Sequence, residues 1–123
     1  MKNRLFLLLV CIFTIISCYN KQKNIYYFDN VTEKSEFVIK NSNLDGHIFK
    51  IELHFHGEID GSALIIYSDN NDSIGYKPKI EIDKGIVDTL IYTDWYHYEC
   101  FIHYIPKNVT EGNLLLEYEF IHF

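Results

Sequence analysis

The sequence predicts an all-β protein, a single antiparallel β-sandwich of Ig-like or jelly-roll-like architecture. Apolar and polar residues alternate with period two in several short segments, the pattern of half-buried strands. These segments recur roughly every ten residues, with Gly, Asn and Asp between them. After the first twenty residues, no segment shows helical periodicity over more than two turns. The immunoglobulin disulfide signature is absent, so "Ig-like" describes architecture only.

Seven to nine short strands are expected. Residues 47–58 alternate most clearly, although Ile48 is out of phase. One face of this expected strand carries Phe49, Ile51, Leu53 and Phe55, and the other carries Lys50, Glu52, His54 and His56. Residues 63–68 are more apolar, which favours a central strand. Asp83-Lys84-Gly85 is expected to join two strands as a hairpin. The other expected strands are 25–28, 36–40, 79–82, 86–93, a long one at 95–105 stopped by Pro106, and 114–123.

The first eighteen residues have the layout of a secretory leader. Two basic residues precede an apolar run at 5–16, which as a helix would reach roughly 18 Å, against the roughly 30 Å of a bilayer core. The run ends in Ile15-Ile16-Ser17-Cys18. This ending resembles the lipobox of bacterial lipoproteins: an aliphatic residue, a tolerated one, a small one and then cysteine.

The resemblance implies that Cys18 is lipidated. In that family a transferase attaches diacylglycerol to the thiol, a peptidase cuts before the cysteine, and the new N-terminus is acylated, with chains such as palmitate. Residues 1–17 would be the signal peptide, 18–24 a lipidated tether and 25–123 the β-sandwich domain. The partner would be membrane lipid. Tyr19 stands where Asp marks inner-membrane retention in enterobacterial lipoproteins, which favours the outer membrane of the cell envelope.

The charge balance argues against nucleic acid as a partner. Loss of Lys2 and Arg4 with the leader leaves 9 basic residues against 17 acidic ones, a net charge of −8. Arg4 is the only arginine, so the mature domain has none for phosphate or guanine recognition. Cys100 is the only cysteine after Cys18, which excludes an intramolecular disulfide in the mature domain. Its strand parity predicts a buried, inert thiol.

Histidines are the candidate metal ligands. His54 and His56 lie two residues apart with Glu52, so they leave the same face of a strand. His97, Glu99 and His103 would share a face of another strand. Were the two strands neighbours, four imidazoles and two carboxylates would converge, a set that suits Zn²⁺ or Cu²⁺. The alternative is that these side chains form ordinary solvated strand faces.

Two other patterns are typical of ligand-binding sites. Trp95, Tyr96 and Tyr98 lie at the expected mouth of a strand, where they would form a platform for a sugar ring or a peptide, or pack into the core. Residues 69–75 superficially resemble an acidic calcium loop. The EF-hand pattern needs Gly and Glu where this chain has Ile74 and Ile80, which favours a plain polar loop.

No catalytic motif is present, and no cofactor is predicted. The chain has no Gly-x-Ser-x-Gly and no phosphate-binding glycine loop. We therefore expect a membrane-anchored, non-enzymatic binding or structural module of the cell envelope. It would meet an envelope protein or glycan partner through loops 69–75 and 106–112 at one end of the sandwich, or through a free strand edge. The alternative is a histidine-based Zn- or Cu-binding envelope protein.

Overall fold

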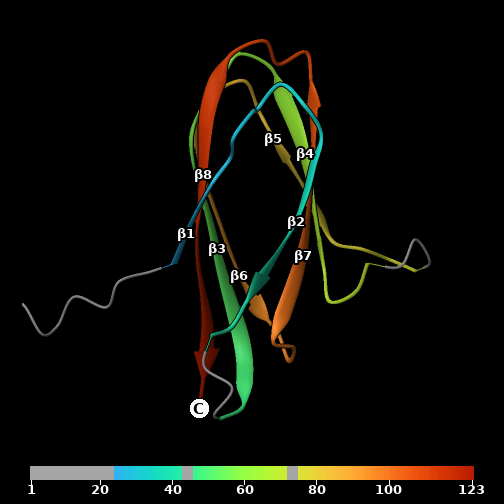
Figure 1. The fold of residues 1–123 in the computed structure, drawn as a ribbon, viewed down its shortest axis with the longest axis vertical. Coiled ribbons are helices and arrows are strands. Elements are labelled where there is room, and N and C mark those ends of the chain that lie inside the picture. The colour runs from blue at the N-terminus through green and yellow to red at the C-terminus, as the bar shows by residue number, and fades with distance from the viewer. Residues whose placement is uncertain (1–23, 43–45, 72–74) are drawn as a thin grey trace, which may run out of the picture.

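The chain folds as two four-stranded antiparallel sheets packed face to face, which confirms the predicted all-β sandwich (Figure 1). The structure is a computed structural model and describes residues 24–42, 46–71 and 75–123. These residues form eight strands, with no helix and no closed barrel. The predicted leader and the residues before Asn24 lie outside the described part of the chain.

The strands divide evenly between the sheets. In spatial order, sheet A holds β1 (Asn24–Tyr27), β8 (Gly112–His122), β3 (Ile48–Ile59) and β6 (Gly85–Asp94). Sheet B holds β2 (Ser35–Lys40), β7 (Glu99–Lys107), β4 (Ser62–Ser68) and β5 (Lys79–Ile82). The apolar strand β4 is central in its sheet, as its composition predicts.

The pairing between strands is nested. β1 pairs with β8, β2 with β7, β3 with β6 and β4 with β5, all antiparallel. Such nesting arises when a long hairpin of paired segments is rolled into two layers, which is the jelly roll. Of the two predicted architectures, the strand order is therefore that of the jelly roll. One consequence is that the first and last strands lie side by side in sheet A (Figure 1).

The core lies between the sheets and is built mainly from alternate residues of β3, β7 and β8. Ile51, Leu53 and Phe55 of β3 are fully buried, because every second side chain points to the partner sheet. Tyr104 of β7 is fully buried too, and its hydroxyl donates a 2.7 Å hydrogen bond to the carbonyl of Val31. Such burial of apolar surface is the main stabilising contribution, about 25 cal/mol per Å².

A register shift corrects the predicted phase at the start of β3. Between Ile48 and Lys50 the pairing of β3 with β8 is irregular. The extra residue lets Ile48 turn inward, where it is buried, whereas Phe49 is only partly buried and stacks on Phe123 with ring centroids 4.7 Å apart. The prediction that Phe49 shares the face of Ile51, Leu53 and Phe55 is therefore wrong, and Ile48 faces the core instead.

The predicted hairpin between 79–82 and 86–93 is wrong. β5 pairs with β4 in sheet B, and β6 pairs with β3 in sheet A, so the chain changes sheets at Asp83 and Lys84. The longer ladder decides which strand β6 pairs with. β6 pairs with β3 over ten residue pairs, whereas β5 is only four residues long. Gly85 has φ +113°, a conformation that favours glycine where the chain redirects.

The long strand predicted at 95–105 is displaced. β7 begins at Glu99, because residues 95–98 carry the chain from sheet A, where the Trp95 backbone N–H still donates to the Phe49 carbonyl, to sheet B. At the other end, Pro106 does not stop the strand. It pairs with Ala63 of β4, while β2 covers β7 only as far as Tyr104. A proline is tolerated at a position where a strand has one free side.

The two candidate loops lie at opposite ends of the sandwich, not at the same end. Asp60, in the β3–β4 turn, accepts hydrogen bonds from the backbone N–H groups of Thr110 and Glu111 in the β7–β8 loop, at 2.8 and 3.1 Å. Asp69, which begins the other loop, instead contacts His97 at 2.9 Å, near the β6–β7 crossing. Antiparallel β4 separates these two places, as Figure 1 shows.

Candidate metal centre

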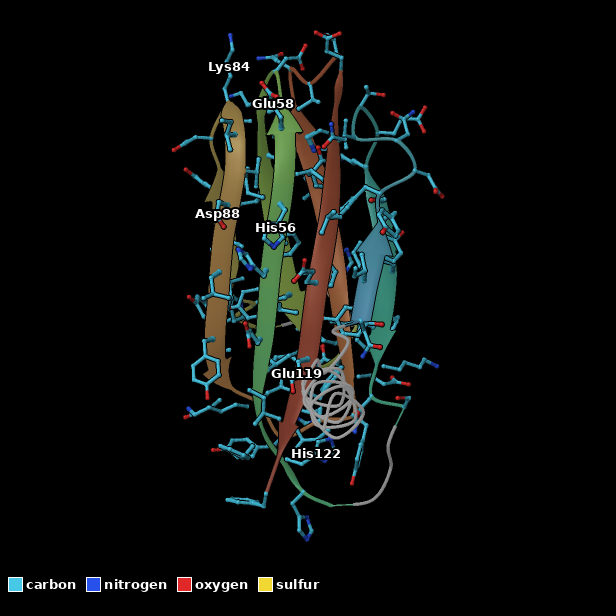
Figure 2. The ribbon with its side chains drawn as sticks, turned by 90° about the vertical axis from the view of Figure 1, so that its left-hand side faces the viewer. His56, Glu58, Lys84, Asp88, Glu119 and His122 are labelled. Carbon is cyan, nitrogen blue, oxygen red and sulfur yellow. The ribbon has the colours of Figure 1, made fainter. Side chains whose placement is uncertain are left out.

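The outer face of sheet A carries two adjacent histidines. His54 and His56 are two residues apart on β3, so both side chains leave the face opposite the core. β3 lies between β6 and β8, and the β6 register places Asp88 directly opposite His56 (Figure 2). Sheet pairing therefore fixes the backbone positions of all three residues.

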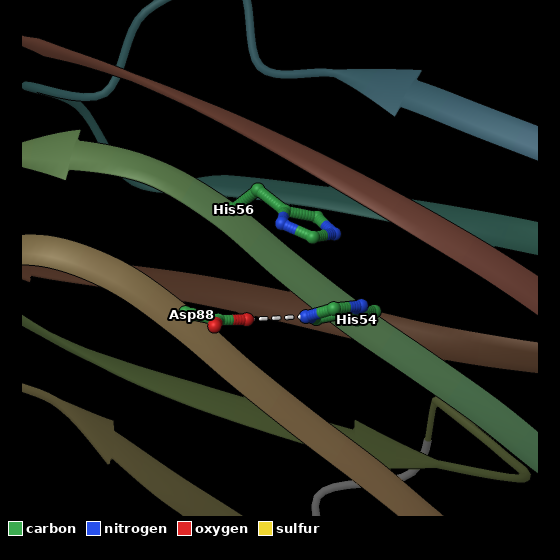
Figure 3. A group of neighbouring side chains, drawn as sticks. All are labelled: His54, His56 and Asp88. Carbon is green, nitrogen blue, oxygen red and sulfur yellow. Dashed lines mark hydrogen bonds and ion pairs between the residues drawn. The ribbon is translucent and has the colours of Figure 1, made fainter.

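The three side chains converge, as Figure 3 shows. Each offers one ligand atom, and these atoms all lie within 4.8 Å of one another. The Nε2–H of His54 donates a 2.5 Å hydrogen bond to Oδ1 of Asp88, and the two imidazole centroids are 3.6 Å apart. Protein ligands bind Zn²⁺ at roughly 2.0–2.2 Å, so ligands on one ion are at most about 4 Å apart. Small side-chain rotations would therefore bring the group into coordination.

The electrostatics favour a cation at this position. The hydrogen bond from His54 lowers the pKa of Asp88, and positive charge on either imidazole lowers it further. The lowered pKa favours the ionised form of Asp88, which is the form that can bind a cation. The histidine side chains are 23% and 33% exposed and that of Asp88 is 74% exposed, so a small ion can reach all three from solvent.

The donor set of two imidazoles and one carboxylate is one that transition metals accept. Imidazole nitrogen suits Zn²⁺ and Cu²⁺, and a carboxylate oxygen completes a three-ligand set. A tetrahedral ion held by three protein ligands keeps one open position. A second carboxylate lies nearby: Oε1 of Glu117, on β8, is 3.7 Å from Nε2 of His56.

The other predicted ligands do not join this group. β3 and β7 belong to different sheets, so the condition for convergence of all four histidines is not met. His103 lies on the outer face of sheet B, with Nδ1 3.1 Å from Glu36. His97 precedes β7 and pairs with Asp69. Glu99 lies 3.4 Å from Lys40.

Asp88 is a candidate ligand that the sequence pattern alone does not reveal. Its position in an alternating segment shows only that it faces away from the core. Its partner depends on which strand lies beside β6, and the expected hairpin with 79–82 gave the wrong neighbour. Pairing 86–93 with the histidine-bearing strand would have placed Asp88 beside His56.

The aromatic candidates divide between the core and the surface. Trp95 is only 8% exposed and packs among the core residues, with Tyr67 and His97 beside its rings. Tyr96 is 70% exposed, and the Tyr98 hydroxyl donates to the carbonyl of Gly46 at 3.2 Å. Trp95 therefore packs into the core, as one of the two predicted alternatives has it. Of the three aromatic candidates, only Tyr96 and Tyr98 are on the surface.

Cys100 is buried, as its position in the alternating pattern of its strand predicts. It is fully buried, and burial raises the pKa of its thiol to about 12. A protonated thiol is a poor nucleophile and a poor metal ligand. The thiol is accordingly inert, and Cys18 lies outside the described residues.

A hollow of about 490 Å³ opens at the end of the sandwich away from Trp95. Its charged lining includes Glu58, Asp60, Glu111 and Lys84, and Figure 2 shows Glu58 and Lys84 at that end. None of the predicted metal-ligand or aromatic residues lines it, whereas Glu111 and Gly112 belong to the predicted partner loop 106–112.

Comparisons with protein families, curated proteins and solved structures find no match for this chain. Within the described residues, no helix has the length and apolar character needed to cross a membrane.

Proposed function

We propose that this chain is a lipid-anchored envelope protein that binds a divalent transition-metal ion, Zn²⁺ or Cu²⁺, on the outer face of its sandwich. One observation carries the metal function: ligand atoms of His54, His56 and Asp88 lie within 4.8 Å of one another on two paired strands. The ladder between β3 and β6 runs on both sides of these residues, so the backbone needs no rearrangement to bind an ion.

The location is supported by the leader. The charge, length, small residue and cysteine of residues 1–18 agree with a lipoprotein signal. One acyl chain binds a membrane weakly, whereas two or three hold it stably. The first strand begins at Asn24, soon after Cys18, so the sandwich would be held close to the membrane surface.

Isothermal titration with Zn²⁺ and Cu²⁺ tests the metal function on the full chain in detergent. We expect one ion per chain with micromolar or tighter affinity. Replacing His54 or His56 by Ala, or Asp88 by Asn, should weaken binding at least tenfold, because each change removes a ligand. The matched controls are His97→Ala and His103→Ala, which remove imidazoles elsewhere.

The controls make the outcome specific. Wild-type affinity in both control variants, together with loss in the three ligand variants, supports the centre. Equal weakening in all five would indicate nonspecific binding to histidines, and absence of heat with either ion would end the metal proposal.

Mass spectrometry of the natively expressed protein tests the anchor separately. We expect a product that begins at Cys18 and carries diacylglycerol and an acyl chain, recovered with membranes. The Cys18→Ala variant should keep its leader and lose the lipid, whereas Cys100→Ala should be processed normally. An unmodified thiol at position 18 with the leader attached would refute the anchor and leave the metal centre untouched.

A further inference from the structure

We infer that Glu117 positions His56 for metal binding by holding the proton on Nε2, so that Nδ1 is the atom that binds the ion. This inference rests on the proposed metal function. The centre would then use Nε2 of His54, Nδ1 of His56 and the carboxylate of Asp88, with Glu117 behind the second imidazole.

The first observation is an unpaired nitrogen. The His56 side chain is 33% exposed, yet its Nε2 is shut off from solvent and has no hydrogen-bond partner. A buried polar nitrogen without a partner is unfavourable because it has given up its hydrogen bonds to water, so such atoms are uncommon. The carboxylate at 3.7 Å is the group that can satisfy it.

The second observation is the placement of the two carboxylates on opposite sides of β3. Asp88 is on β6, and Glu117 is on β8, opposite His54 in the register and diagonal to His56. The Glu117 side chain is itself only 31% exposed, which limits its motion and the screening of its charge by water. The histidine pair is therefore flanked by one carboxylate from each neighbouring strand.

These positions assign the ring atoms by elimination. An ion arrives from solvent, and Nε2 of His56 is closed to solvent and faces Glu117. Nδ1 is therefore the nitrogen of His56 left to bind it. His54 differs, because its Nε2 already points at Asp88 from 2.5 Å. The ion would take the place of the proton between them, and that proton would move to Nδ1 of His54 or leave to solvent.

The chemistry of such a pair is well defined. A histidine that binds a metal through one nitrogen usually donates the other N–H to a carboxylate or a carbonyl, which fixes the tautomer and the ring orientation. A shift of less than about 1 Å in the Glu117 side chain would close the 3.7 Å separation to hydrogen-bond length. Loss of such an outer partner weakens metal affinity by about 10–100-fold.

The first experiment needs no metal. Nitrogen-15 NMR of the imidazole rings, recorded on the full chain in detergent at a pH where His56 is neutral, reports which nitrogen carries the proton. We expect the Nε2–H tautomer at His56 in the wild type and a mixture in Glu117→Ala. A predominant Nδ1–H tautomer in the wild type would overturn the inference.

The second experiment is Zn²⁺ titration of Glu117→Ala and Glu117→Gln, with Glu119→Ala as the control. Glu119 lies on the same strand, and Figure 2 shows it well away from His56. We expect Glu117→Ala to bind about 10–100-fold more weakly. Glu117→Gln should retain most of the affinity, because its amide oxygen still accepts from Nε2–H, and the control should match the wild type.

The alternatives give different results. If Glu117 were itself a metal ligand, Gln would fail as badly as Ala, which would overturn the positioning role. Unchanged affinity in Glu117→Ala would overturn it too. If the wild type binds no metal, the proposed function fails, while the tautomer measurement still decides whether Glu117 orients His56.

Discussion

The Tyr104 hydroxyl joins the interior of the sandwich to the segment between β1 and β2. It is fully buried, donates to the Val31 carbonyl at 2.7 Å, and has its pKa raised by burial to about 12. Tyr104→Phe should therefore lower the free energy of unfolding by about 1–3 kcal/mol, because a buried carbonyl loses its partner. Urea denaturation measures the change. The exposed Tyr76→Phe should change it by less than about 0.5 kcal/mol, and equal effects would contradict the role of the bond.

Asp60 makes the stability depend on pH. Hydrogen bonds from the Thr110 side chain and backbone, and from the Glu111 backbone, lower the pKa of its carboxyl in the folded state. Its stabilising contribution is thus complete above the unfolded pKa, about 3.9, and is lost as pH falls through the folded value.

The test is a comparison of the wild type with Asp60→Asn by urea denaturation. The difference in unfolding free energy should be constant from about pH 5 to 7 and shrink below about pH 4. A difference that grows on acidification would contradict the assigned sign.

At the scale of strands, Gly57 sets how closely β3 approaches β8. Its φ is +140°, and a Cβ there would lie 2.1 Å from the Asn113 carbonyl oxygen. Gly57→Ala must therefore push the strands apart next to His56. Gly85 offers a matched control, because its φ is +113° but a Cβ would meet nothing within 4 Å.

We predict that Gly85→Ala lowers the unfolding free energy by about 1–3 kcal/mol through backbone strain alone. Gly57→Ala should be worse by a further 1–3 kcal/mol or so, and should also weaken Zn²⁺ binding. Thermal or urea denaturation with titration checks both. Similar losses in the two variants would mean that contact with β8 is not what constrains Gly57.

The local sequence pattern predicts where the strands lie better than it predicts which strands pair with each other. Period-two alternation locates β3 and β8, because each buries one face and exposes the other. The same alternation cannot reveal which strand lies beside β6, since pairing depends on contacts between distant segments. The misplaced hairpin and the overlooked Asp88 share that cause. The shift at Ile48 is also invisible locally, because the extra residue is accommodated against β8.

At the scale of the molecule, nested pairing makes nearly every ladder non-local. β1 pairs with β8 and β2 with β7, so strands far apart in the sequence must meet before either sheet is complete. Such topologies fold in milliseconds to seconds. Stopped-flow refolding followed by Trp95, the only tryptophan and a buried one, should show rates in that range. Completion within microseconds would contradict this view of the fold.

The short first strand has a mechanical consequence. If the chain is moored through Cys18, any tension between the membrane and the sandwich enters at Asn24 and loads β1 first. β1 is held by only four residue pairs with β8, and it lies at the border of sheet A. Beyond it, Phe28 is buried and its N–H donates to the Leu114 carbonyl at 3.1 Å. A modest pull would thus peel β1 away and lengthen the tether, while Phe28 resists further unravelling of the sandwich.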